Sequence, residues 1–345
     1  MSKRAAIAKA TGVEANTATS DLSILGSQAV VELALEISAA IVSSSAGRKP
    51  RVSRSGCNLI ALQLLIVAAG LRRGALIDAL GLTAAQASAI SLRLISFGKQ
   101  KAQYNDLQRV RLLYHAPTDQ TFIVSSRESL WTDVETLTGG TASEHLCPAL
   151  WVDARSTPEH TFPTLAAPDA HTMSLITAIR KAVTTDNSLD VLIASQPLSE
   201  QYGSNIEAQV VGVALAGFLL EYGSVYCLHD IEQTPASCTY DVRPLHRMQR
   251  DASSEANFAA PPTNCLGSQP LIVYRVHWSD STSKLELFSF SIPQCLCSDA
   301  DVQKLRQALV DTFQSRVNSL QSSSTFASGS ISVEMATVTL HQVAL

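Results

Sequence analysis

The chain has 345 residues, of which 46% are hydrophobic and 16% charged, and its formal net charge is −4. A chain of this length can form one large domain or two modest ones, and the composition is typical of a compact globular protein. The near-neutral charge argues against a general nucleic-acid-binding protein, which is usually basic. The seven cysteines are scattered and odd in number, which excludes a disulfide framework and favours reduced thiols in the cytoplasm or nucleus.

Residues 1–20 are polar and small and predict a disordered tail. The first residues carry lysine and arginine but no apolar segment, so a secretory signal peptide is not expected. A basic start without acidic residues also resembles a transit peptide, and the sequence leaves this targeting role open. Asp21 can then cap a helix over residues 22–42. Residues 43–55 form a linker that is either a solvated loop or a local phosphate or localisation patch.

Helices and strands alternate in the first half of the chain, which indicates an α/β fold. Residues 59–69 predict a strongly apolar helix that ends at Gly70, and Ala75 to Asp78 predict a short buried strand. Thr83 and Gln86 fit a capping box that begins a helix to about Phe97. Further strands are predicted at residues 110–115, 121–125, 149–153 and 189–194, and further helices from a capping box at 125–128 to Gly140 and at 170–183.

Residues 206–230 are the stretch around which we expect the rest of the fold to pack. Every residue from Val210 to Leu220 is apolar or glycine, and a helix that is apolar on all sides must be covered on all sides. The run is too short to cross a bilayer, so we expect no membrane span. Gly223 is expected to end the helix, and residues 224–228 to form a central strand. The pattern predicts a helix buried between a sheet and a further layer.

The second half of the chain predicts mainly strands. Residues 230–262 are rich in proline and have no apolar periodicity, which predicts a flexible insertion. Residues 271–292 alternate like a hairpin at the edge of a sheet, residues 299–317 predict an amphipathic helix, and residues 331–340 predict one or two strands. The whole pattern predicts an α/β fold with a single domain over residues 21–345, in which helices cover both faces of a mixed sheet.

Several segments carry a resemblance to known sequences. They are Gly70–Asp78 (GLRRGALID), Gly217–Tyr226 (GFLLEYGSVY), Asn264–Leu271 (NCLGSQPL) followed by Leu287–Pro293 (LFSFSIP), and the tail from Ser330 to Leu345. In this order they resemble an uncharacterised eukaryotic family whose human member is the product of chromosome 1 open reading frame 74. The family phrase after the apolar helix is usually Gly-Tyr-Pro, whereas this chain has Glu221-Tyr222-Gly223. The resemblance implies a single domain, and because the family has no assigned activity it implies no catalytic residues.

The candidate site residues are Asp78, Asp153 and His229, each at the end of an apolar strand. In parallel α/β sheets these strand ends collect ligands, and carboxylates there hold a divalent cation or do acid–base chemistry. The alternative is that each aspartate bonds nearby backbone amides and that His229 lies on the surface. The sequence assigns no metal or cofactor, since Cys295 and Cys297 have the wrong spacing for a zinc pair.

Two hypotheses about function follow from these features. The chain has no phosphate-binding glycine loop and no nucleophile elbow, which favours a non-catalytic interaction or scaffold protein with a protein partner at the hairpin of residues 271–292. The alternative is an enzyme whose carboxylate-lined pocket, with or without a metal, is formed by Asp78, Asp153 and His229. Nothing in the sequence indicates a substrate, a specific partner or an oligomeric state.

Overall fold

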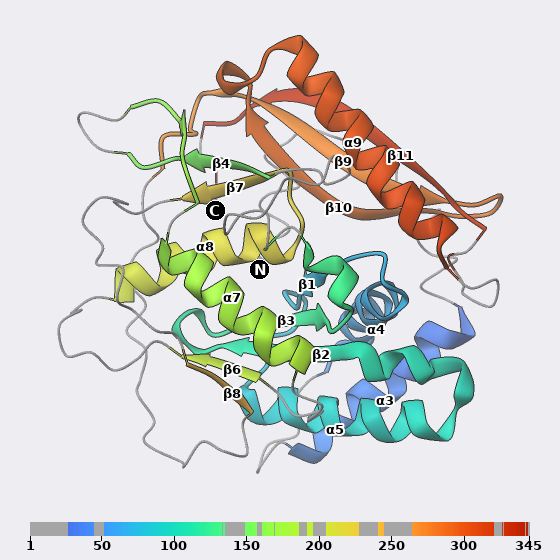
Figure 1. The fold of residues 1–345 in the computed structure, drawn as a ribbon. Coiled ribbons are helices and arrows are strands. Elements are labelled where there is room, and N and C mark those ends of the chain that lie inside the picture. The colour runs from blue at the N-terminus through green and yellow to red at the C-terminus, as the bar shows by residue number, and fades with distance from the viewer. Residues whose placement is uncertain are drawn as a thin grey trace.

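In the computed structural model the strands of the described residues form three sheets, arranged around a central helix, α8 (Figure 1). The structure describes residues 27–44, 52–132, 134, 149–156, 161–168, 170–185, 192–195, 205–227, 241–244, 264–320, 326, 328–341 and 343. The helices are α3 (Gln28–Ser44), α4 (Arg54–Ala69), α5 (Ala84–Gln100), α7 (Ala170–Thr185), α8 (Asn205–Leu219) and α9 (Asp299–Asn318), with 3-10 turns η1 (Ala102–Arg109), η2 (Ala116–Thr118), η3 (Glu128–Leu130) and η5 (Gln294–Leu296). The strands are β1 (Gly74–Leu76), β2 (Val110–His115), β3 (Gln120–Ser125), β4 (Leu150–Asp153), β5 (Thr164–Leu165), β6 (Leu192–Ser195), β7 (Ser224–Cys227), β8 (Asp241–Pro244), β9 (Pro270–Ser279), β10 (Lys284–Pro293) and β11 (Ser330–Thr339).

The largest sheet has the strand order β1-β3-β2-β6-β8. It is mixed, because β2 and β6 are parallel whereas the other neighbouring pairs are antiparallel. Alternate residues of a strand point to opposite faces. Leu112 and Ile123 accordingly join a core with α3, α4 and α5, whereas Leu113 and Phe122 join a second core with α7 and α8. Helices therefore cover both faces of this sheet, as the sequence predicts.

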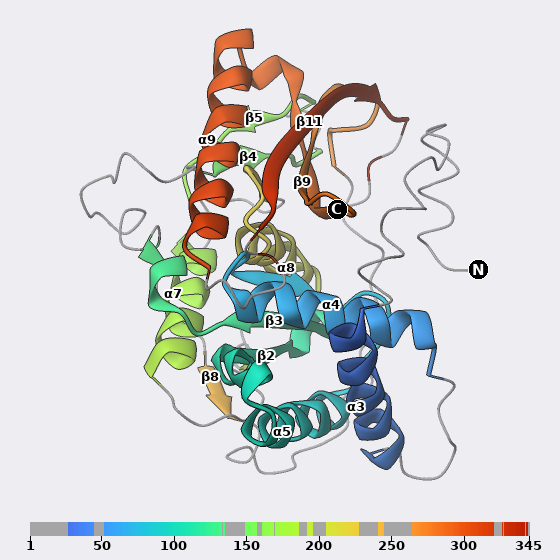
Figure 2. The same cartoon turned by 90° about the vertical axis from the view of Figure 1, so that its right-hand side faces the viewer.

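Helix α8 lies between the five-stranded sheet and a smaller sheet with the order β5-β4-β7 (Figure 2). Leu215 and Leu219 of α8 are fully buried. A Cβ atom placed on Gly217 would lie 3.4 Å from the Cα atom of Val225 in β7, and one placed on Gly74 in β1 would lie 2.9 Å from the carbonyl oxygen of Leu219. These close approaches place a sheet on each side of the helix. The burial predicted for this helix is confirmed over residues 212–220 except at Val213 and Ala216, which are partly buried.

The third sheet is antiparallel, with the order β10-β9-β11, and α9 lies along it (Figure 1). Aromatic residues fill the contact between them. Tyr274 of β9 donates a hydrogen bond to the carbonyl oxygen of Val302 in α9, and the rings of Phe288 in β10 and Phe313 in α9 are 5.1 Å apart. The pairing of β10 with β9 shifts register between Glu286 and Phe288, which marks a β-bulge. The bulge lies beside the cavity described below.

The α/β class predicted from the sequence is confirmed, but the strands form three sheets instead of one. The strands β9, β10 and β11 have ten residues each, and β10 and β11 both pair with β9 over almost their full length. These three strands therefore do not extend the mixed sheet. β9 is therefore the middle strand of its sheet, and β10 and β11 are the outer ones. In the predicted helix from residue 125 to Gly140, residues 128–130 form a 3-10 turn, Thr132 and Val134 are helical, and residues 135–140 lie outside the described residues.

Two segments predicted to lack fixed structure fall mostly outside the described residues. The tail 1–20 is not described at all, and most of the insertion 230–262 is not described either. The exception is the short stretch 241–244, which forms β8 and pairs in antiparallel fashion with β6. This part of the insertion is thus a strand of the five-stranded sheet.

Candidate functional site

Arg72 and Arg73 are buried in the turn that joins α4 to β1. Gly70 ends α4 with a φ angle of 87°, a left-handed conformation that favours glycine. The two arginines that follow are only 5% and 4% exposed. Arginine is almost never this buried unless its charge and its N–H groups are compensated by partners. The partners of Arg72 differ from those of Arg73, and the difference separates a structural role from a candidate binding role.

The guanidinium group of Arg73 contacts two aromatic rings, a backbone carbonyl and a carboxylate. Its guanidinium carbon lies 5.4 Å from the ring centre of Trp131 and 4.3 Å from that of Phe218, which places the cation between two aromatic faces. Its Nε donates to the carbonyl oxygen of Leu130 at 2.7 Å. A carboxylate oxygen of Glu221 lies 3.8 Å from its Nη2. Arg73 therefore ties the α4–β1 turn to the end of α8.

Glu221 is the carboxylate that compensates Arg73, and it also pairs with Arg316 of α9. Arg316 donates to both carboxylate oxygens, at 2.9 and 2.6 Å, and the backbone N–H of Arg73 donates at 2.6 Å. Burial alone raises the pKa of the Glu221 carboxyl, but the charges of Arg316 and Arg73 outweigh it and hold the pKa at about 2. This buried triad connects three elements and leaves little space around it. We assign it a structural role.

Arg72 has no carboxylate in hydrogen-bonding contact among the described residues. Its Nη1 donates to the carbonyl oxygen of Leu287 at 2.8 Å, and its Nη2 to that of Leu220 at 3.2 Å. The guanidinium carbon lies 4.9 Å from the ring centre of Phe288. Burial lowers the pKa of Arg72, although the nearby Glu221 and Tyr222 oppose this shift. The carbonyl of Leu287 is available because the β-bulge at this point interrupts the ladder between β10 and β9.

A cavity of about 410 Å³ lies beside Arg72, between α4, β1 and the bulged part of β10. We call it the Tyr222 cavity. Its polar lining consists of Gln63, Arg72, Asp78, Tyr222, Glu286 and Ser289, and the rest is apolar. Ligand pockets of this size commonly combine an apolar wall with a few convergent polar groups. The composition of this cavity therefore fits a binding site for a small molecule.

Three charged groups of the cavity act electrostatically on Tyr222. The ring of Tyr222 stacks on those of Phe288 and Phe290, with ring centres 6.2 and 6.0 Å away. Burial raises the pKa of Tyr222; the positive charge of Arg72 lowers it, and the negative charges of Asp78 and Glu286 raise it further. The hydroxyl therefore stays protonated at neutral pH and lies in the field of all three charged groups.

Two buried polar atoms of the cavity residues lack a hydrogen-bond partner. They are the Nε of Arg72, a donor, and the Oε1 of Gln63, an acceptor; neither bonds to any group within the described residues. The large majority of buried polar side-chain atoms in proteins have a partner, so each exception calls for an explanation. Both residues line the cavity, although the two atoms themselves have almost no accessible surface, so a polar ligand would meet them only if the side chains turn toward it.

Of the two candidate residues that the structure describes, Asp78 lines the Tyr222 cavity and Asp153 does not. Asp78 is exposed and lies two residues after the end of β1. Asp153 ends β4 in a different sheet and is bound by Arg155, whose Nη2 donates at 2.7 Å and whose Nε donates to both carboxylate oxygens at 3.0 Å. His229 lies outside the described residues. The convergence of Asp153 and His229 with Asp78 stays a prediction.

Sequence reasoning did not single out Arg72, Gln63, Tyr222 or Glu286. The only signal for Arg72 was an arginine pair followed at once by a buried strand, where a charged residue is unexpected. Gln63 was a similar signal, because it is the one polar residue between Leu59 and Ala69. The sequence gives no such signal for Tyr222 and Glu286, because their role depends on the folding of α8 and β10 against α4. Among the described residues, no group of three or more His, Cys, Asp or Glu could hold a metal ion.

Comparison with known protein families shows the family to which the chain belongs. Residues 42–345 match the family model described as a domain of unknown function, DUF4504. The chain belongs to this family. The DUF4504 match spans every residue named for the Tyr222 cavity and for the buried triad. No curated protein and no solved structure gives a significant match. Membership of an uncharacterised family is thus confirmed, whereas the resemblance to the family of the human chromosome 1 product stays a prediction. Within the described residues, none of the helices has the length and apolar character needed to span a membrane.

Proposed function

We propose that this DUF4504 protein is a non-catalytic binding protein that holds a small polar molecule in the Tyr222 cavity. One observation carries the proposal: Arg72 Nε and Gln63 Oε1 are buried polar atoms of two residues that line one cavity, and neither atom has a partner among the described groups. A buried donor or acceptor left unpaired costs about 1–3 kcal/mol. A ligand that bonds to both atoms recovers this free energy when it binds.

The charges of the cavity narrow the chemical class of the ligand. Arg72 contributes one positive charge, whereas Asp78 and Glu286 contribute two negative ones, so an ammonium group on the ligand is favoured. The Nε of Arg72 needs an oxygen acceptor, and the Oε1 of Gln63 needs an N–H donor. A primary amide supplies both groups. We therefore propose a ligand that carries an amine at one end and an amide or similar carbonyl group at the other.

The first prediction concerns binding of simple compounds of this class. We expect saturation-transfer NMR with the full chain to detect binding of ω-amino amides. In a series from glycinamide to 6-aminohexanamide, one chain length should bind more tightly than the others. The matched n-alkyl amides, which lack the ammonium group, should bind more weakly. Asp78→Asn should weaken binding roughly tenfold, because it removes a charge-assisted contact at an exposed position that folding tolerates.

A matched pair of tyrosine variants controls this experiment. Tyr222→Phe should weaken binding several-fold, because it removes the hydroxyl from the cavity. Tyr114→Phe removes a hydroxyl that bonds to Asp119 at 2.7 Å in the β2–β3 hairpin and should leave binding unchanged. Equal binding by both variants, or equal binding of amino amides and plain amides, would contradict the proposed site.

An enzyme remains the second candidate, for one specific reason. Asp78 and Glu286 line the same cavity as the protonated Tyr222 hydroxyl, and two carboxylates and a phenol in one cavity are groups that acid–base catalysis uses. The same NMR samples distinguish the two functions. Conversion of an added amino amide by the wild-type chain, lost in Asp78→Asn and in Glu286→Gln, would favour the enzyme over the binding protein.

We also propose that the chain resides in the cytoplasm or nucleus and meets a protein partner. Among the described residues, Cys57, Cys265, Cys295 and Cys297 are free thiols, which supports a reducing compartment. A partner would add to the sheet at β11, an outer strand whose side chains are largely exposed. Recovery of no stoichiometric partner in a pull-down from native extract would count against this part of the proposal.

A further inference from the structure

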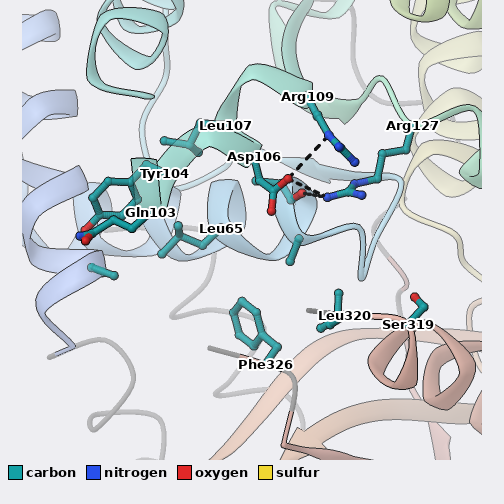
Figure 3. A pocket seen from close by; sticks show the side chains of 13 residues that line it. Leu65, Gln103, Tyr104, Asp106, Leu107, Arg109, Arg127, Ser319, Leu320 and Phe326 are labelled. Carbon is teal, nitrogen blue, oxygen red and sulfur yellow. Dashed lines mark hydrogen bonds and ion pairs between the residues drawn. The ribbon is translucent and has the colours of Figure 1, made fainter. Parts of the chain in front are cut away.

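A second cavity, of about 360 Å³, lies on the other side of α4 between η1 and the end of α9 (Figure 3). One wall is polar and contains Asp106, Arg109 and Arg127. The opposite wall is apolar and includes Leu65, Leu320 and Phe326, which face the polar group across the opening. The cavity shares no lining residue with the Tyr222 cavity, so it is a separate site.

Two arginines of this cavity share a single carboxylate oxygen. Arg127 Nη2 donates to Asp106 Oδ1 at 3.2 Å, and Arg109 Nε lies 3.6 Å from the same oxygen. In Figure 3 both guanidinium groups turn toward Asp106. Two positive charges and one negative charge leave the group with a formal charge of +1. A further anion at this place would therefore be attracted by both arginines.

Arg127 also has an unused hydrogen-bond donor. Its Nη2 donates to the carbonyl oxygen of Ala68 at 2.8 Å, at the end of α4. Its Nε is buried and has no partner within the described residues. Burial lowers the pKa of Arg127, the positive charge of Arg109 lowers it further, and the negative charge of Asp106 opposes this shift. The Nε lies against Gly70, where an added Cβ atom would be 3.0 Å away, but the side chain is 23% exposed, so the rest of the planar guanidinium group is suited to bind a carboxylate.

We propose that this cavity binds an aliphatic monocarboxylate. Its carboxylate would lie between Arg109 and Arg127, and its alkyl chain would pack against Leu65, Leu320 and Phe326. A monoanion matches the formal charge of +1. A strongly hydrated inorganic anion should bind more weakly than the carboxylate, because it would lose hydration beside the apolar wall. The site is independent of the amine-binding site proposed above.

The test is isothermal titration calorimetry of the full chain with hexanoate, and with hexan-1-ol and inorganic phosphate as comparison probes. Hexanoate should bind with a dissociation constant of millimolar order or lower, more tightly than either comparison probe. Arg109→Gln should weaken hexanoate binding roughly tenfold, and added salt should weaken it as well. The side chain of Arg109 is 54% exposed, so this variant is expected to fold.

Arg93→Gln is the matched control, because Arg93 is similarly exposed and pairs with Glu36 between α5 and α3, away from the cavity residues. It should bind hexanoate as the wild type does. Arg127→Lys keeps the charge but loses the planar donor and should also weaken binding. Unchanged hexanoate affinity in Arg109→Gln, binding of hexan-1-ol or phosphate at least as tight as that of hexanoate, or no hexanoate binding up to about 10 mM would each overturn the proposal.

Discussion

Glu221 holds a backbone conformation that glycine adopts without strain. Its φ angle is 57°, and a non-glycine residue in the left-handed region costs free energy. The sequence predicted that Gly223 ends the apolar helix, but α8 ends at Leu219 and the left-handed residue is Glu221. The contacts of its carboxylate with Arg73 and Arg316 offset the cost. Those arginines are far away in the sequence, so no local rule could have placed the helix end here.

The Glu221 carboxyl makes a testable contribution to acid stability. Its pKa is about 2 in the folded chain, against 4.5 for an ordinary glutamate. Because the folded pKa is the lower one, the contribution is fully present above pH 4.5 and is lost as the pH falls toward 2. It amounts to about 3 kcal/mol. Urea unfolding between pH 4.5 and 2 should show this loss in the wild type and much less of it in Arg316→Gln.

The same variant is less stable at neutral pH, because it leaves a buried carboxylate with one charged partner fewer. Removing one partner of a buried ion pair typically costs about 3–5 kcal/mol. Arg93→Gln breaks an exposed ion pair instead and should cost less than about 1 kcal/mol. Equal losses for the two variants would show that the buried triad does not stabilise the fold as argued here.

At the scale of elements, the position of α8 depends on the close approach of backbones. A Cβ atom on Gly74 would lie 2.9 Å from both the carbonyl oxygen of Ile123 and that of Leu219, and backbone cannot move aside as a side chain can. Gly74→Ala should therefore lower the free energy of unfolding by about 1–3 kcal/mol. Gly81→Ala is the control, since nothing lies within 4 Å of its added methyl group. Identical urea midpoints for the two variants would contradict the described packing of α8.

Much of the element pattern could be predicted because it is local. The capping box at Thr83 and Gln86 is present, Gly70 ends α4, and the all-apolar run of α8 is buried on both sides. The division into three sheets could not be predicted, because it depends on which strands find each other across long sequence separations. For the same reason the site was found only in part: Asp78 is in the cavity, but its neighbours come from α4, the end of α8 and the bulge in β10.

For the whole molecule, the candidate site lies where the layers meet. The residues that line the cavity come from α4, from β1 of the five-stranded sheet and from β10 of the third sheet. Leu220 and Tyr222, which follow the central helix, line it as well. Arg72 donates to the carbonyl oxygens of both Leu220 and Leu287 and so connects the end of the central helix with β10. A ligand in the Tyr222 cavity would contact all of them. We therefore expect binding to raise the unfolding temperature of the entire chain rather than of one segment.

Arg72 Nε is the ligand contact on which the proposed binding site depends most. The direct measurement is the ¹H–¹⁵N signal of that Nε–H group in the full chain, identified by its loss in Arg72→Lys and followed as ω-amino amides are added. We predict a saturable shift of this signal while that of Arg93 stays in place. A binding ω-amino amide that leaves the Arg72 signal unmoved would contradict the central claim.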